Sequence, residues 1–153
     1  MREVRRSALV PQTPAQIYAL VNDVRSYPQF LNWCPRTTVH AETEESVTAT
    51  IFLERAGLRT QLTTTNTLRA GERIDMQLTD GPLRSFAGHW QFVPIRALGR
   101  DGLPGALKGC RVELEVRFEF RNRALGLLLG PLFEATWDSL VDAFVKRARE
   151  VYR

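Results

Sequence analysis

The chain has 153 residues, of which 44% are hydrophobic and 25% are charged, and these proportions exclude a disordered, fibrous or collagen-like protein. Its two cysteines are too few for a disulfide framework. Together with its two histidines they offer too few ligands for an ordinary zinc site. The net charge of +4 fits plain solubility, and it also fits an RNA or an anionic lipid partner, whereas no DNA partner is expected.

The N-terminus has no basic segment followed by an apolar one, because Met1 is followed at once by charged residues. The longest apolar stretch, 124–133, is about half of the ~20 residues that cross a bilayer. We therefore expect an intracellular, cytoplasmic protein that is at most peripheral at an inner membrane.

A first strand is expected over 3–10, where Val4, Ala8 and Val10 share one face. Pro11 ends this strand. The segment that follows has the pattern of a helix start, with a capping residue, a proline and a glutamine in the capping-box position. A second proline, Pro28, predicts that this helix is split near 26–28.

Aromatic residues and prolines are concentrated in the next segment, 27–35. Two interpretations stay open for it. It is either a turn that packs on the core or the mouth of a cavity.

Alternating apolar residues then predict six further strands, near 38–42, 47–53, 59–69, 74–78, 86–92 and 112–120. On this assignment His40, Phe52 and His89 point outward, and the small residues Ala41, Ala49 and Gly88 point inward. Residues 94–109 are rich in Gly and Pro and are expected to form a long loop.

Apolar residues recur at steps of three and four toward the C-terminus and predict a helix over 131–151. Gly126, Gly130 and Pro131 weaken the helical pattern before it. Short turns between consecutive strands favour an antiparallel sheet, so the fold class is α+β, with the helices covering one face. We expect one domain over 1–153.

No catalytic set accompanies this pattern. Neither histidine has a Ser, Cys or carboxylate at a spacing typical of a triad, and no zinc, nucleotide or nucleophile-elbow motif is present. Glu113, Glu115 and Glu119 share a strand face with Arg117 and are interpreted as surface charge. The chain is therefore expected not to be an enzyme and to need no cofactor.

The inward aromatic residues have two interpretations, a filled core or the wall of an apolar cavity. A sheet that curves around a long helix leaves space between the two, and an apolar pocket with few polar groups suits lipid-like ligands. The side chains expected to contact such a ligand are Tyr27, Phe30, Leu31, Trp33, Leu83, Phe86, Trp90, Phe92, Phe118, Phe133, Trp137, Leu140 and Phe144.

The chain resembles the coenzyme Q-binding (ubiquinone chaperone) family of the START-like, helix-grip superfamily, whose bacterial branch is named for a ribosome-association toxin. The resemblance extends over nearly the whole chain and is carried by the segments 7–11, 18–24, 27–31, 33–34, 64–68, 80–82, 88–92, 118–120, 130–133, 140–144 and 147–152. This chain has Asn32 where the family usually has Pro and Leu83 where it has Phe, and its 95–108 segment is longer than usual.

The resemblance implies a curved seven-stranded antiparallel sheet gripping the C-terminal helix, with a short split helix after the first strand. It also implies binding of ubiquinone or another isoprenoid lipid in the cavity, in support of respiratory electron transport. The alternative that it implies is an inhibitor that binds the large ribosomal subunit and blocks subunit association. A transient membrane contact through Phe52, Leu103 or Leu107 is a further expectation.

Overall fold

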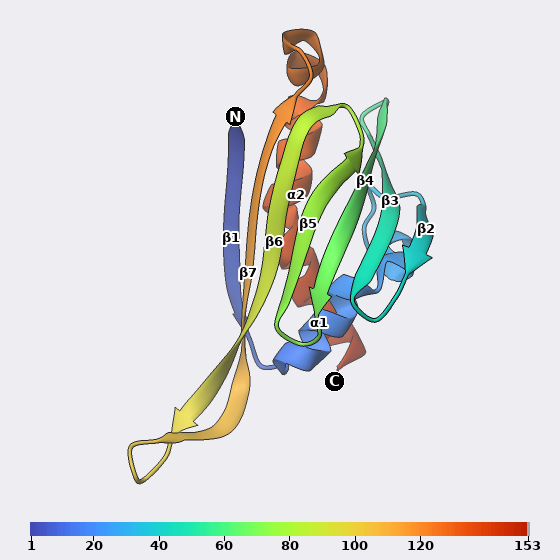
Figure 1. The fold of residues 1–153 in the computed structure, drawn as a ribbon. Coiled ribbons are helices and arrows are strands. Elements are labelled where there is room, and N and C mark those ends of the chain that lie inside the picture. The colour runs from blue at the N-terminus through green and yellow to red at the C-terminus, as the bar shows by residue number, and fades with distance from the viewer. Residues whose placement is uncertain (153) are drawn as a thin grey trace.

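The alternating segments form seven strands of one sheet in the structure, a computed structural model that describes residues 1–152. The strands are β1 (Arg2–Val10), β2 (Thr37–Glu42), β3 (Ser46–Arg55), β4 (Leu58–Arg69), β5 (Arg73–Asp80), β6 (Leu83–Leu98) and β7 (Pro104–Phe120). All neighbours are antiparallel, in the order β1-β7-β6-β5-β4-β3-β2. The predicted seven-stranded antiparallel sheet is confirmed, and it curves around the C-terminal helix (Figure 1).

The split helix after β1 is also present, as α1 (Pro14–Asn22) followed by the 3-10 helix η1 (Val24–Gln29). The Thr13 hydroxyl accepts a hydrogen bond from the backbone N–H of Gln16 at 3.2 Å, and the Gln16 side chain accepts one from the Thr13 N–H at 2.9 Å. This capping box fixes the start of α1. Pro28 lies inside η1, where the tighter helix replaces a continued α-helix.

The C-terminal helix α2 (Arg123–Val151) begins eight residues earlier than the sequence pattern predicts. Asn122 caps it by accepting a hydrogen bond from the N–H of Leu125 at 2.9 Å. Gly126 and Gly130, which weaken the helical pattern, are where the side chain of Arg2 contacts α2. Its guanidinium donates a hydrogen bond to the carbonyl of Gly126 at 3.1 Å and lies against Gly130. An α-helix of 29 residues is ~43 Å long at 1.5 Å per residue, so α2 crosses the whole sheet.

By length and composition alone, α2 could also cross a membrane. Half of its most apolar window is buried within this structure, mostly against the sheet, so we read it as the core helix of the fold. The prediction that no segment is long enough to cross a bilayer depended on the stretch 124–133 alone, and the helix extends well beyond it, to Val151.

The expected long loop over 94–109 is wrong. Residues 94–98 and 104–109 extend β6 and β7 as a paired hairpin, and only 99–103 form the turn. Two register shifts, between Ile95 and Arg96 and between Arg96 and Leu98, mark bulges that accommodate the irregular composition. Prolines are tolerated because this hairpin has no strand on either side, so a missing N–H breaks no ladder to a neighbour. We call residues 94–109 the arm.

Two of the three small residues expected to leave space inside the sheet do not do so. A bulge after Val39 places Ala41 at an exposed position. At Gly88 the space is already filled, because an added Cβ would lie 2.6 Å from a Val116 methyl and 3.2 Å from the Met76 methyl. Phe52 does lie on the outer face, where the guanidinium of Arg36 stacks 4.0 Å from its ring centre.

Candidate functional site

A small cavity lies between the sheet and α2, and it is the enclosed site of the structure that best fits the expected ligand position. Its volume is about 40 Å³, and its wall is formed by Val24, Tyr27, Trp33, Ala49, Ile51, Leu62, Thr64, Asn66, Met76, Trp90, Trp137 and Leu140. Ligand pockets usually measure ~300–1,000 Å³, so the preformed hollow is far smaller than expected.

Aromatic side chains fill most of the space that the sequence left open. The ring of Phe144 lies at the centre, 5.5 Å from the ring centre of Tyr27, 5.3 Å from that of Phe30 and 5.4 Å from that of Trp90. Phe86 and Trp137 pack 5.4 Å apart beside them. The three contacts of Phe144 are edge-to-face, a geometry that stabilises a core. Together these rings leave only a small cavity.

Polar groups line one part of this otherwise apolar cavity. Thr64 and Asn66 project from β4, and the Thr64 hydroxyl donates to the Asn66 side-chain oxygen at 2.9 Å. Trp137 forms the opposite wall from α2, and its buried indole N–H has no acceptor among residues 1–152. A buried donor without an acceptor costs about 1–3 kcal/mol, so a guest that accepts a hydrogen bond from Trp137 would recover that energy.

A second, open groove of about 500 Å³ lies outside the cavity, between the 29–33 segment and α2. Its apolar floor is formed by Phe30, Leu31 and Trp33, and its rim carries charged residues of α2. Arg147 spans this rim, with its guanidinium 5.2 Å from the ring centre of Phe30 and a 3.0 Å hydrogen bond to Gln29.

Trp33 belongs to the wall of both the groove and the cavity. It lies in the segment after η1 that has no helix or strand, and its side chain is buried. It is therefore a side chain that the two hollows share. Of the two interpretations of the 27–35 segment, the burial of Tyr27, Leu31 and Trp33 supports packing on the core, and the cavity mouth stays a prediction.

The structure divides the predicted ligand-contacting residues into three groups. Tyr27, Trp33, Trp90, Trp137 and Leu140 line the cavity, whereas Phe30 and Leu31, together with Trp33, line the groove. The others are buried in the core beside the cavity without lining it, namely Leu83, Phe86, Phe92, Phe118, Phe133 and Phe144.

The polar part of the wall was not predicted from the sequence. Thr64 and Asn66 alternate with outward residues and share the face of Leu62 and Leu68, so their positions could have been read from parity.

The cavity wall contains no His, Asp, Glu, Lys, Arg or Cys. Its one titratable side chain is Tyr27, whose hydroxyl donates to the carbonyl of Val21 and whose pKa is raised, chiefly by burial. Nearby, burial raises the pKa of the Cys34 thiol to about 11, so this thiol is protonated at neutral pH. The wall can therefore bind and orient a molecule, but it offers no acid–base pair.

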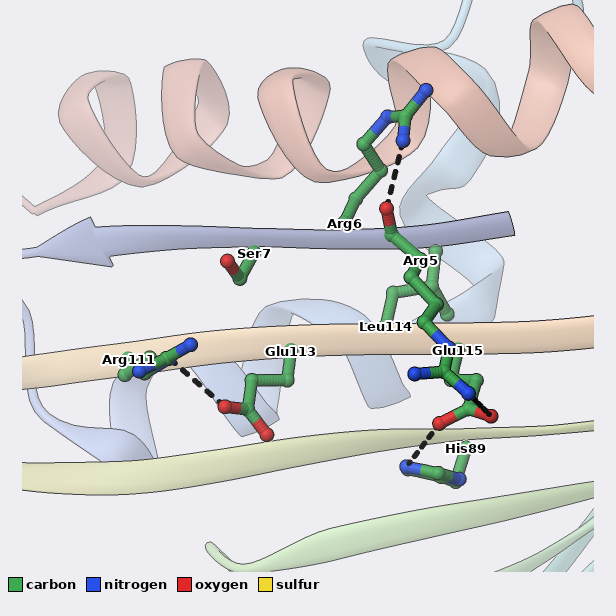
Figure 2. Close-up of a pocket in the computed structure, with 8 residues that line it drawn as sticks. All are labelled: Arg5, Arg6, Ser7, His89, Arg111, Glu113, Leu114 and Glu115. Carbon is green, nitrogen blue, oxygen red and sulfur yellow. Dashed lines mark hydrogen bonds and ion pairs between the residues drawn. The ribbon is translucent and has the colours of Figure 1, made fainter. Parts of the chain in front are cut away.

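His89 and the strand carboxylates lie instead on the outer face, in a shallow charged groove across β1, β7 and β6 (Figure 2). Glu115 is the centre of this network, with Arg5 at 3.4 Å, Arg117 at 3.2 Å and His89 at 3.9 Å. Because its charges are paired and partly exposed, we interpret it as a surface network of small energetic weight.

Comparison with known proteins places residues 10–145 in a family described as polyketide cyclase/dehydrase and lipid transport. The ribosome association toxin RatA of Escherichia coli is 38% identical over 152 residues, which cover 99% of this chain and 90% of that protein. The mitochondrial coenzyme Q-binding protein COQ10 of Drosophila melanogaster is 24% identical, over 94% of this chain and 57% of that protein.

Among solved structures, the Zhui aromatase/cyclase from a Streptomyces species superposes with a TM-score of 0.79 at 14% sequence identity. The match covers 99% of this chain and 96% of that chain. At this identity the likeness describes the fold alone, and it confirms the predicted helix-grip architecture.

Proposed function

Because this chain belongs to the polyketide cyclase/dehydrase and lipid transport family, and within it to the ribosome association toxin relatives, we propose that it binds an amphipathic lipid without converting it. The ligand class that fits best is an isoprenoid quinone such as ubiquinone. The observation that carries this proposal is the buried Trp137 indole N–H, which lacks an acceptor in the wall of an apolar cavity.

The polar ring of the ligand would lie at the cavity. A quinone ring is flat and apolar on its faces and carries carbonyl oxygens at its edge, so one carbonyl can accept from Trp137. The Asn66 amide on the facing strand can donate to a second oxygen. Since the present volume is about 40 Å³, the ring enters only if the wall moves outward.

The apolar tail would leave through the groove. Trp33 separates groove and cavity, so its displacement opens a continuous path past Phe30 and Leu31. Such a tail gains about 0.8 kcal/mol for each CH₂ removed from water, which is enough to offset the movement of one segment. Lys146 and Arg147 lie at the rim of this groove.

The direct experiment is organic extraction of the purified protein with mass spectrometry, followed by titration with ubiquinone. Trp137→Phe removes the unpaired donor while retaining an aromatic ring, and we expect about a 5- to 10-fold weaker affinity, the equivalent of one hydrogen bond. Trp90→Phe is the matched control. Trp90 lines the same cavity, but its indole N–H, unlike that of Trp137, is not a buried donor that lacks an acceptor.

Equal losses of affinity for Trp137→Phe and Trp90→Phe would show that only volume matters, and the hydrogen bond would be rejected. Empty extracts together with no measurable binding of added quinone would reject the lipid proposal as a whole. An intact far-UV spectrum for both variants is the check that folding is preserved.

A second candidate function is supported by the full-length relatives, which are named ribosome association toxins. We propose that this chain, as a cytoplasmic protein, contacts the large ribosomal subunit and hinders subunit joining. Co-sedimentation with purified large subunits at low salt is the expected result, with a steep loss as salt increases because phosphate contacts release counterions. Absence of co-migration at low salt would exclude this function.

A further inference from the structure

The arm is the most distinctive projection of the molecule. β1 pairs with β7 only as far as Val10 and Cys110, and β5 pairs with β6 only between Arg73–Gln91 and Gln77–Ala87. Beyond these points β6 and β7 continue as an isolated two-stranded ribbon, drawn in yellow and orange at the lower left of Figure 1. Five strand residues, 94–98, extend it by about 16 Å at ~3.3 Å per residue.

Three leucines of the arm are exposed in the part of the chain that the structure describes. Leu98 is 82% exposed, Leu103 is 61% exposed and Leu107 is 38% exposed. Leu98 pairs with Pro104 beside the turn, and Leu103 lies in the turn itself, so both are at the tip. Single exposed leucines are ordinary, but three on one slender hairpin are unusual.

Basic residues accompany these leucines along the arm. The arm carries Arg96, Arg100 and Lys108 against one acidic residue, Asp101, which gives a net charge of +2 from three positive charges minus one. Asp101 accepts a hydrogen bond from the N–H of Leu103 at 3.0 Å and so stabilises the turn. Among residues 1–152, none of the three basic residues has a carboxylate within ion-pair distance.

We propose that the arm docks the protein on an anionic lipid surface, with Leu98 and Leu103 inserted at the level of the headgroups. Exposed apolar side chains with flanking Lys and Arg are the chemistry that binds the bilayer interface, where long basic side chains reach anionic headgroups. This inference does not depend on what the cavity binds.

Two other partners fit the arm less well. RNA-binding surfaces stack bases on aromatic side chains, and residues 94–109 contain no Phe, Tyr or Trp. A second copy of the chain would bring two arms of charge +2 together, and their repulsion opposes edge-to-edge pairing.

The test uses the full chain and vesicles of phosphatidylcholine with or without 30% phosphatidylglycerol. We expect flotation with the anionic vesicles only. The double variant Leu98→Ser/Leu103→Ser is expected to reduce the partition coefficient at least tenfold, and Arg100→Gln/Lys108→Gln to reduce it about fivefold for each charge removed. All four positions are exposed, so thermal unfolding should not change.

The matched control is Leu127→Ser/Leu128→Ser, because these leucines are similarly exposed on α2, far from the arm. The location is read independently from Leu103→Cys labelled with an environment-sensitive fluorophore, since Cys34 and Cys110 are buried and should not react. A blue shift with anionic vesicles supports the proposal. Three outcomes would overturn it. The control pair could lose as much vesicle binding as the arm variants, the unaltered chain could fail to float, or the arm variants could lose only ribosome or RNA binding.

Discussion

Replacing Phe133 with alanine is expected to lower the free energy of unfolding by about 3–5 kcal/mol. Phe133 has no exposed surface, and its ring centre lies 5.9 Å from that of Phe118 and 5.3 Å from that of Phe120. These contacts join α2 to β7, so the alanine variant leaves a cavity where helix and sheet meet. Urea unfolding followed by circular dichroism measures the loss directly.

The control for this prediction is Leu128→Ala, on the same helix but 55% exposed. It should change the free energy of unfolding by no more than about 0.5 kcal/mol. A loss of less than about 1 kcal/mol in the free energy of unfolding for Phe133→Ala, below the usual range for buried Phe, would contradict the packing of α2 on β7.

Replacing Gly109 with alanine is expected to destabilise the protein by about 3 kcal/mol, at the upper end for a side chain forced into a packed site. Gly109 lies where the arm leaves the sheet, and an added Cβ would overlap the carbonyl oxygen of Val10 and lie 3.3 Å from the Cα of Pro11. Both obstacles are backbone atoms of the chain at the end of β1, which cannot rotate away. Thermal and urea unfolding should both show the loss.

The same substitution at Gly126 should change the free energy of unfolding in the opposite direction. A Cβ there meets only ordinary contacts at 3.7 Å or more, and alanine is favoured over glycine inside a helix by about 1 kcal/mol. Gly126→Ala is therefore expected to stabilise the protein. If Gly109→Ala proved as stable as Gly126→Ala, the close approach of β7 to the end of β1 would be refuted.

Much of the architecture could be predicted because alternation and capping are local signals. Val112 to Phe120 alternates apolar and charged residues, and the structure places the apolar set inside. Thr13 and Gln16 likewise form the predicted cap. Each of these signals depends on residues a few positions apart, so the sequence contains all the information that is needed.

The features that could not be predicted depend on contacts between distant segments. Gly126 and Gly130 weaken a helix in isolation, but the side chain of Arg2, more than 120 positions away, lies against them. The size of the cavity likewise depends on how the lining rings of Trp90 and Trp137 pack against Phe144 and Phe86 behind them. Parity identifies which residues point inward, whereas their mutual packing decides how much space remains.

The pairing of β1 with β7 has a consequence for how the chain folds during synthesis. Arg2 is paired with Phe118, so the first strand must wait for almost the whole sheet to be translated before it finds its partner. At ~5–20 residues per second this interval is roughly 6–23 s. Until then the N-terminal strand has no native neighbour, and closure of such a long loop makes the final step slow compared with formation of the local hairpins. The nascent protein therefore passes through a stage in which β2 to β6 can pair while the first strand is still unpaired and the helix that covers the sheet has not yet been made.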